Sequence, residues 1–487
     1  MLKGRNGTLL AITASFLLSC LLYKVSFNDV SLVQFGITTA ILSASSYSYF
    51  KWHSQPRHTL PLFAILSFMY WLYFGLAVYL GERTVGGQIG IVAPEVSNGS
   101  VTNALLLAGL GVFSLWIGMQ IRLGKRIVVP YKPTITLVGR RLQYVRAVLI
   151  FGGILGSIEV APFVFGEGAR QMLTIAISII PTLAFTLLFI RCLRREGAAL
   201  DKLLVVGFLI FRLITGLSSG WLGAFPSTLV VCAAIYIAET RKVPWTAVTL
   251  VVIFTLFFQV GKKDFRTAYW TEQADATKID RVTFWTQRSF EIWTEAITDP
   301  SGEVLKEGLN QSLARLSLLT QSANVVDQTP SIVPYQYGRL YSYMAITWIP
   351  RLLWPGKPSM NEANRFYQVT YGLSTEENVD SVNIGVGVLT EGYISFGWIG
   401  AAGIMFLIGI FCDFYQVAFL QRSSGMLMNG IGIVLLPQMM GVESQVAVYL
   451  GGFVQQVSFT LVLLLPVIEW TQNKASLLPV SARLSSK

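Results

Sequence analysis

The sequence has few charged residues for its length. Charged residues make up 13% of the 487 positions and hydrophobic residues 53%, and the mean hydropathy is +0.57. Because so few polar side chains cannot cover a soluble protein of this size, the composition excludes an ordinary soluble domain. Instead, apolar runs of about 20 residues, the length that crosses the hydrocarbon core of a bilayer, recur along the chain.

Histidine and cysteine are also scarce, which limits the available chemistry. His53 and His58 both fall in one basic loop, so the rest of the chain offers no imidazole for acid/base chemistry or zinc binding. The cysteines lie in or beside apolar runs and lack CxxC spacing: Cys20, Cys192, Cys232 and Cys412. We therefore expect no disulfide framework, no metal site and no cofactor.

The apolar runs predict an all-α polytopic membrane protein. We expect a bundle of about twelve transmembrane helices with a large, partly helical extracytoplasmic loop. Residues 1–260 would contain spans 1–9, residues 261–385 the loop, and residues 386–487 spans 10–12 and a cytoplasmic tail. The expected spans begin near Thr8, Ser31, Thr59, Ala104, Ala147, Met172, Leu203, Trp221, Trp245, Trp398, Met426 and Val446.

The net charge of +11 is spread over alternate loops, most clearly over residues 122–146. By the positive-inside rule these loops and both termini are cytoplasmic, and segment 261–385 lies outside. Basic residues that gather on one domain would indicate nucleic acid, but here they are divided among loops. We therefore expect no nucleic-acid partner.

Segment 261–385 contains several helical patterns. Aromatic and charged residues alternate over 281–298, as in an amphipathic helix at a membrane interface. Leucines recur at spacings of three and four over 309–319 and predict a second helix. The apolar stretch 341–354 is too short to span and fits an interfacial or re-entrant segment. Residues 361–371 predict a short helix.

Basic residues in this segment predict an anion site. Pro350 and Pro355 bracket Arg351 and restrict the backbone, so a fixed turn would hold Arg351 near Lys357. A guanidinium and an ammonium group suit a diphosphate. Further candidates are Arg266, Arg315 and Arg339, with Lys262, Lys263 and Arg365 nearby. The alternative interpretation is that these residues are solvated loop charges.

Two charged residues lie within or beside apolar runs. Arg212 is in the middle of run 203–219, where an unpaired charge costs at least ~2.5 kcal/mol. It should therefore bind an anion, either a substrate phosphate or an acid such as Glu159 or Glu443. Glu391 precedes an apolar run, so desolvation would suit a general acid or base near neutral pH. The position of Glu391 equally fits a carboxylate at the end of a helix that forms an ion pair with a neighbouring arginine.

These motifs resemble a known family, the Wzy-type O-antigen polymerases of bacteria. The resemblance rests on IPRLLWPGKP at 349–358, on EGYISFG at 391–397 followed by Gly400, and on Arg315 in a leucine-rich helix. It implies a metal-independent, inverting glycosyltransferase that resembles the GT-C class. Its substrate would be an oligosaccharide linked to undecaprenyl diphosphate, at the outer face of the bacterial inner membrane.

The resemblance also implies residue roles. Arg351 and Lys357 would hold the donor diphosphate and neutralise the charge that develops as it leaves. Glu391 would accept the proton of the attacking hydroxyl, and Arg315 and Arg212 would assist phosphate binding. The implied partners are the lipid-linked substrate and membrane lipid, and a chain-length regulator is a candidate.

Three alternatives remain open. The related O-antigen ligases depend on a histidine in the outer loop, and segment 261–385 contains none. A transporter or flippase for lipid-linked sugars would turn over without forming glycosidic bonds. A non-catalytic assembly protein would tolerate loss of Arg351.

Overall fold

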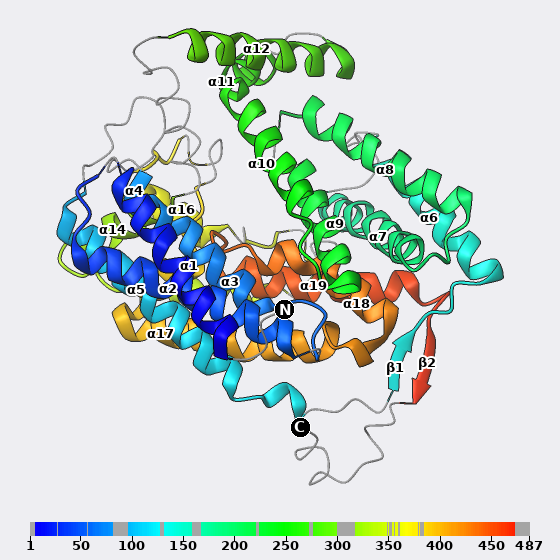
Figure 1. Cartoon of the computed structure of the whole chain (residues 1–487), viewed down its shortest axis with the longest axis horizontal. Coiled ribbons are helices and arrows are strands. Elements are labelled where there is room, and N and C mark those ends of the chain that lie inside the picture. Colours follow the sequence, from blue (N-terminus) through cyan, green and yellow to red (C-terminus); the bar gives the residue numbers. More distant parts are fainter. Residues whose placement is uncertain are drawn as a thin grey trace.

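The computed structural model describes residues 5–26, 28–55, 57–80, 96–126, 131–157, 167–220, 224–271, 276–299, 317–347, 349, 353–354, 356–358, 361–377, 379 and 384–472. Over these residues the protein is mostly helical, with one two-stranded sheet (Figure 1). The all-α class predicted from the sequence is therefore confirmed in its coarse form.

Two groups of helices lie on either side of a central pair (Figure 1). The first group contains α1 (Arg5–Lys24), α2 (Leu32–Ser54), α3 (Leu62–Tyr70), α4 (Leu76–Leu80), α5 (Asn98–Gln120), α14 (Leu319–Gln328), α16 (Glu362–Thr370) and α17 (Val388–Phe419). The second contains α6 (Gly139–Ser157), α7 (Glu167–Leu193), α8 (Ala199–Ser218) and α9 (Ala224–Thr240). The central pair is α18 (Gly425–Met439) and α19 (Val446–Leu464), and α18 packs against α7, α9 and α17.

A further unit projects from the bundle at the top of Figure 1. It consists of α10 (Trp245–Val260), α11 (Lys262–Arg266), a π turn (Thr267–Thr271) and α12 (Lys278–Thr298). Its apolar contacts form a small cluster of Leu217, Phe258, Phe265 and Trp285, separate from the main core. The remaining short elements are a π turn (Trp71–Gly75), 3-10 turns (Leu123–Lys125, Arg339–Tyr341 and Arg422–Ser424), α15 (Ser342–Ile346), β1 (Tyr131–Thr134) and β2 (Glu469–Gln472).

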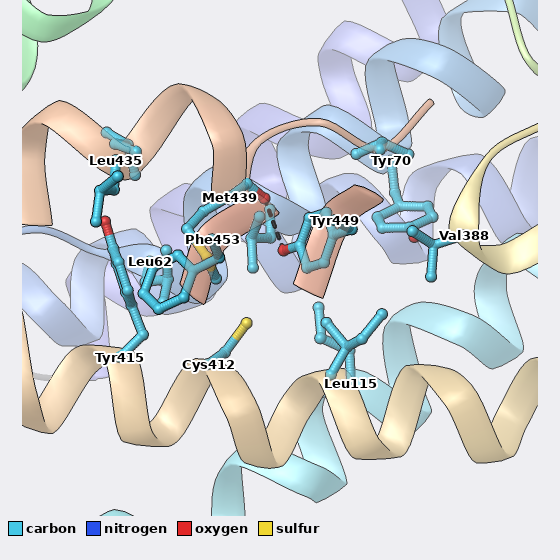
Figure 2. Close-up of a cluster of buried hydrophobic side chains, with 14 of the residues drawn as sticks. Leu62, Tyr70, Leu115, Val388, Cys412, Tyr415, Leu435, Met439, Tyr449 and Phe453 are labelled. Atoms are coloured by element: carbon cyan, nitrogen blue, oxygen red, sulfur yellow. Dashed lines mark hydrogen bonds between the residues drawn. The ribbon is translucent and has the colours of Figure 1, made fainter. Parts of the chain in front are cut away.

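The main core joins helices that are far apart in the sequence. Figure 2 shows Tyr70 of α3 and Leu115 of α5 close to Cys412 of α17 and to Tyr449 of α19. The Tyr449 hydroxyl is buried, and it donates a hydrogen bond to the Met439 carbonyl at 2.9 Å. This bond satisfies the one polar group that the tyrosine brings into the apolar cluster.

Glycines let α5 and α17 cross at very short range. A β-carbon at Gly118 would lie 2.1 Å from the Phe406 carbonyl oxygen, and one at Gly409 would lie 2.3 Å from the Leu115 carbonyl oxygen. Small residues at a crossing allow backbones to approach closely, as they do between membrane helices. The α17 helix is thereby held directly against α5.

The predicted number of about twelve spans is wrong for the described residues. Four helical segments there are long and apolar enough to cross a membrane, or five if the bent pair α10–α11 counts as one span. The four segments are Gly7–Lys24, Leu62–Leu80, Asn98–Gln120 and Val388–Phe419. Two predicted spans fail for different reasons: α9 has 17 residues, fewer than the about 20 that a span needs, and α8 contains three charges, Asp201, Lys202 and Arg212.

The first helix has the surface of a lipid-facing element. Leu9, Leu17 and Leu21 on α1 are each more than half exposed. Contiguous exposed apolar side chains on a helix are typical of contact with lipid or a partner. Together with the four candidate spans, this surface is compatible with a membrane protein.

Several predicted helices in segment 261–385 are confirmed. The interfacial pattern over 281–298 forms α12, which begins with a capping box of Thr277 and Asp280, and residues 361–371 contain α16. The start of the leucine-rich pattern over 309–319 lies outside the described residues. In the same segment, α14 packs against α5 and shares the main core.

The small sheet was not predicted. Antiparallel strands β1 and β2 pair Tyr131 with Gln472 and Thr134 with Glu469. The Glu469 carboxylate also accepts hydrogen bonds from Thr136 and Arg141. Strands of four residues without alternating hydrophobicity have no pattern to detect, and this pairing joins residues that are distant in sequence.

The glycine crossing gives a direct test of the packing. We expect Gly409→Ala to lower the free energy of unfolding by about 1–3 kcal/mol, because the added methyl group would force the two backbones apart. The control is Gly403→Ala on the same helix, where a β-carbon has no neighbour within 4 Å. Thermal unfolding of the purified proteins in detergent measures both. Equal midpoints for the two variants would contradict the close crossing.

Candidate functional site

The α17 helix is broken within the motif EGYISFG. Phe396 (φ −146°, ψ 26°) and Gly397 (φ 62°, ψ −147°) leave the helical conformation, and a positive φ favours glycine. The carbonyls of Ile394 and Ser395 accept hydrogen bonds from the backbone N–H groups of Gln336 and Tyr337, both at 3.0 Å. The segment that contains Gln336 and Tyr337 therefore supplies hydrogen bonds in place of the helical ones that are lost at the break.

The two parts of α17 fold back on each other at this break. A β-carbon at Gly400 would lie 2.2 Å from the Gly392 carbonyl oxygen, and one at Gly392 would lie 2.9 Å from the Ala401 α-carbon. A straight helix would separate residues 392 and 400 by roughly 12 Å along its axis. Residues 388–395 therefore form a short helix against the main helix rather than its linear extension.

Glu391 lies on this short helix and caps another helix. Its side chain is completely buried, and Oε2 accepts a hydrogen bond from the Val446 backbone N–H at 2.6 Å. Val446 is the first residue of α19, so the carboxylate lies where the helix dipole favours negative charge. Among the described residues, Oε1 of Glu391 has no hydrogen-bond partner.

Two hydroxyl groups near Glu391 also lack hydrogen bonds of normal geometry within the described part of the chain. These are Tyr341 Oη and Ser395 Oγ. Burial raises the pKa of the Tyr341 phenol, the neighbouring Ser395 hydroxyl opposes the rise, and the Glu391 carboxylate adds to it. Buried polar atoms are rarely left without partners. A water molecule or a substrate hydroxyl could therefore hydrogen-bond to Glu391 Oε1, Tyr341 Oη and Ser395 Oγ.

A network of amides joins three helix starts beside Glu391. The Gln445 side chain accepts a hydrogen bond from the Asn364 backbone N–H and donates one to Asn361 Oδ1, each at 3.2 Å. The Asn364 side chain accepts one from the Val386 N–H at 3.0 Å. The N-termini of α16, α17 and α19 therefore converge here, and their dipoles make the region favourable for negative charge.

Lys357 also lies near α19, but its ammonium group is bound by backbone carbonyls of the protein. It is 5% exposed, and its Nζ donates to the carbonyls of Ile349 at 2.9 Å and Thr347 at 3.4 Å, just after α15. Thr347 in turn packs against Gly451 of α19. A lysine at the C-terminal end of a helix satisfies carbonyls and interacts favourably with the dipole.

The other predicted basic residues differ in environment. Arg339 is exposed, with its guanidinium 5.3 Å from the centre of the Phe366 ring. Arg365 forms an exposed ion pair with Glu376 at 2.7 Å, which weakens the case for it as a phosphate ligand. Arg315 and Arg351 lie outside the described residues.

Arg212 and Arg266 are not part of this group. Arg212 donates to Thr228 Oγ1 at 3.3 Å from α8, so its observed partner among the described residues is a neutral hydroxyl; Glu159, one of its predicted acidic partners, lies outside these residues. Arg266 ends α11, in the projecting unit. Figure 1 shows α11 and α12 at the opposite edge of the molecule from α17.

Of the residues in this region, Glu391 and Lys357 were predicted as site residues from the sequence, and Tyr341, Ser395 and Gln445 were not. A tyrosine, a serine and a glutamine near apolar helices have no distinctive spacing, so no pattern could have selected them. Asn361 and Asn364, at the start of the predicted short helix, were a weak capping signal. No three acidic, histidine or cysteine side chains among the described residues gather as metal ligands would.

Comparison with known proteins gives a family without an assigned function. No curated protein and no solved structure matches the chain. The model of a domain of unknown function, DUF8712, matches residues 109–421, which is more than half of the chain and includes Arg212, Lys357 and Glu391. The chain therefore belongs to the DUF8712 family.

Proposed function

We propose that the protein is a polysaccharide polymerase, a glycosyltransferase that joins lipid-diphosphate-linked oligosaccharides at the outer face of the bacterial inner membrane. The observation that carries the proposal is the Glu391 carboxylate, because one of its oxygens is held by the Val446 N–H and the other has no partner in the described residues. A general base needs a fixed position and a free lone pair. Glu391 has both.

The reaction would proceed by direct displacement. The hydroxyl oxygen of the acceptor sugar attacks the anomeric carbon of the donor while Glu391 Oε1 accepts the hydroxyl proton. The bond between the anomeric carbon and the diphosphate oxygen breaks, and the electron pair leaves with the lipid diphosphate. Attack opposite to the leaving group inverts the anomeric configuration, and Arg351 would stabilise the charge that develops on the diphosphate.

The convergence of helix starts supports a role in phosphate binding. The N-termini of α16, α17 and α19 meet beside Glu391, and exposed Arg339 lies over Phe366 of α16. Helix N-termini and a guanidinium both favour phosphate oxygens. Lys357 would then act indirectly, by holding the end of α15 and the chain that leads to Arg351.

The broken α17 helix favours transport of lipid-linked sugars as a second candidate function. Discontinuous helices with converging N-termini also form anion sites in secondary transporters. Purified protein in vesicles that contain the lipid-linked repeat unit separates the two activities. Movement of the substrate across the bilayer without longer glycans would support transport, whereas longer glycans would support polymerisation.

Glu391→Gln is expected to abolish polymer formation and leave the fold intact. The amide oxygen still accepts the Val446 hydrogen bond, but the amide does not accept a proton at neutral pH. Loss of a general base typically lowers the rate by about 10²–10⁴-fold. Glycan length on a gel and the thermal unfolding midpoint measure the two properties.

The control for this variant is Glu295→Gln, which removes one exposed carboxylate from α12 and should retain full activity. Glu391→Ala should lose both activity and stability, because α19 loses its cap. Normal glycan ladders in Glu391→Gln cells would show that Glu391 is a helix cap alone.

Arg351 and Lys357 are expected to behave differently from each other. Arg351→Ala should leave folded protein that makes only single repeat units, and Arg351→Lys should restore little, because bidentate phosphate recognition needs the guanidinium group. Lys357→Ala should lower the free energy of unfolding by about 1–3 kcal/mol, because it removes the hydrogen bonds from a buried ammonium group to the Ile349 and Thr347 carbonyls. Activity per folded molecule and unfolding midpoints test both. A stable, inactive Lys357→Ala protein would instead place this lysine at the substrate.

A further inference from the structure

A polar pocket lies near the end of α17 that is distant from Glu391. The cavity measures about 190 Å³, and its lining includes Lys51, Trp52, Arg57, Trp116, Arg122 and Asp413. Asp413 follows residue 398, the start of the main α17 helix, by fifteen positions, which is roughly 22 Å along a helix. This basic pocket is therefore separate from the Glu391 site.

Three cations line the basic pocket: Lys51, Arg57 and Arg122. In the described part of the chain, no ion pair involves Lys51, Arg57 or Arg122. The carboxylate in the lining, Asp413, accepts a hydrogen bond from the Gly124 backbone N–H at 2.8 Å. The lining therefore has an excess of positive charge inside a concave surface, where electrostatic attraction to an anion is concentrated.

The backbone around the basic pocket is well fixed. Arg122 has a left-handed conformation (φ 55°) that ends α5, so the chain turns there toward α17. Arg57 lies beside His58, which forms a β-bridge with Gln421. The Arg241 guanidinium lies over the Trp52 ring, 4.1 Å from the ring centre. These contacts hold the wall in place before any ligand binds.

The mouth of the basic pocket borders apolar surface. Trp116 is 42% exposed and Tyr47 is 43% exposed, and Phe113 stacks on Trp116 with ring centres 6.0 Å apart. Tyr47 and Trp116 line the pocket, and Phe113 extends the exposed surface along α5. Aromatic residues beside basic ones, at the end of a helix that is a candidate span, are typical of the membrane interface.

We infer that the basic pocket binds the phosphate of an anionic phospholipid headgroup, with the acyl chains along the exposed face of α2 and α5. Lysine and arginine supply the charge and hydrogen-bond donors that a phosphodiester needs. The apolar border distinguishes a lipid from free phosphate, which would gain nothing from Trp116 and Phe113. The positive-inside rule assigns this end of the bundle to the cytoplasmic leaflet, where such lipids attract basic segments.

The test measures thermal unfolding of the full-length protein in neutral detergent as phosphatidylglycerol, phosphatidylcholine or inorganic phosphate is added. Wild-type protein should be stabilised by phosphatidylglycerol alone. The triple variant Lys51→Gln, Arg57→Gln, Arg122→Gln should bind this lipid roughly 100-fold more weakly, since each basic residue near a membrane surface contributes about fivefold.

The matched control removes the same charge elsewhere, by Arg140→Gln, Arg195→Gln and Lys202→Gln, which are all exposed. It should bind phosphatidylglycerol like the wild type. If the control and the pocket variant lose phosphatidylglycerol binding equally, the lipid is attracted by the charge of the whole surface, and the proposed site is wrong. Equal stabilisation by inorganic phosphate would overturn the lipid assignment. If the triple variant does not fold, Lys51→Gln alone should weaken binding roughly fivefold, and unchanged binding would also overturn the site.

Discussion

The structure around the candidate site depends on one hydrogen bond, from the Val446 N–H to the buried Glu391 carboxylate. A carboxylate without water is costly unless it is compensated, and the first turn of α19 supplies an N–H group together with the positive end of a helix dipole. In return, the carboxylate satisfies a backbone donor that α19 cannot satisfy itself. Each group is stable in the interior because the other is present.

This mutual requirement explains the shape of α17. Glu391 reaches Val446 because the chain breaks at Phe396 and Gly397 and folds back with Gly392 against Gly400. If the helix were straight, residues 388–395 would extend beyond the end of the main helix instead of packing against its side. The glycines of EGYISFG and the following Gly400 are therefore part of the site, although they have no chemical groups of their own.

Sequence patterns predicted the helical class, the α12 and α16 helices and the position of Glu391 beside an apolar helix, because each depends on local composition or spacing. They did not predict the fold-back at Gly397 or the pairing of β1 with β2, which depend on contacts between distant residues. The number of spans was overestimated because an apolar run can form a helix that carries several charges, as α8 does, or one that ends early, as α9 does. The partner of Glu391 was missed for a further reason: a backbone N–H has no signature in the sequence.

The position of Lys357 shows how burial changes the meaning of a predicted ligand. A lysine between prolines fits a phosphate site on sequence grounds, yet its ammonium lies among the carbonyls of Thr347 and Ile349. Movement of the ammonium group away from these carbonyls to bind phosphate would break its hydrogen bonds to them. Exposed cations such as Arg339 do not have this cost, so they fit the proposed role in phosphate binding better. Lys357 is better understood as a residue that holds the chain just after α15.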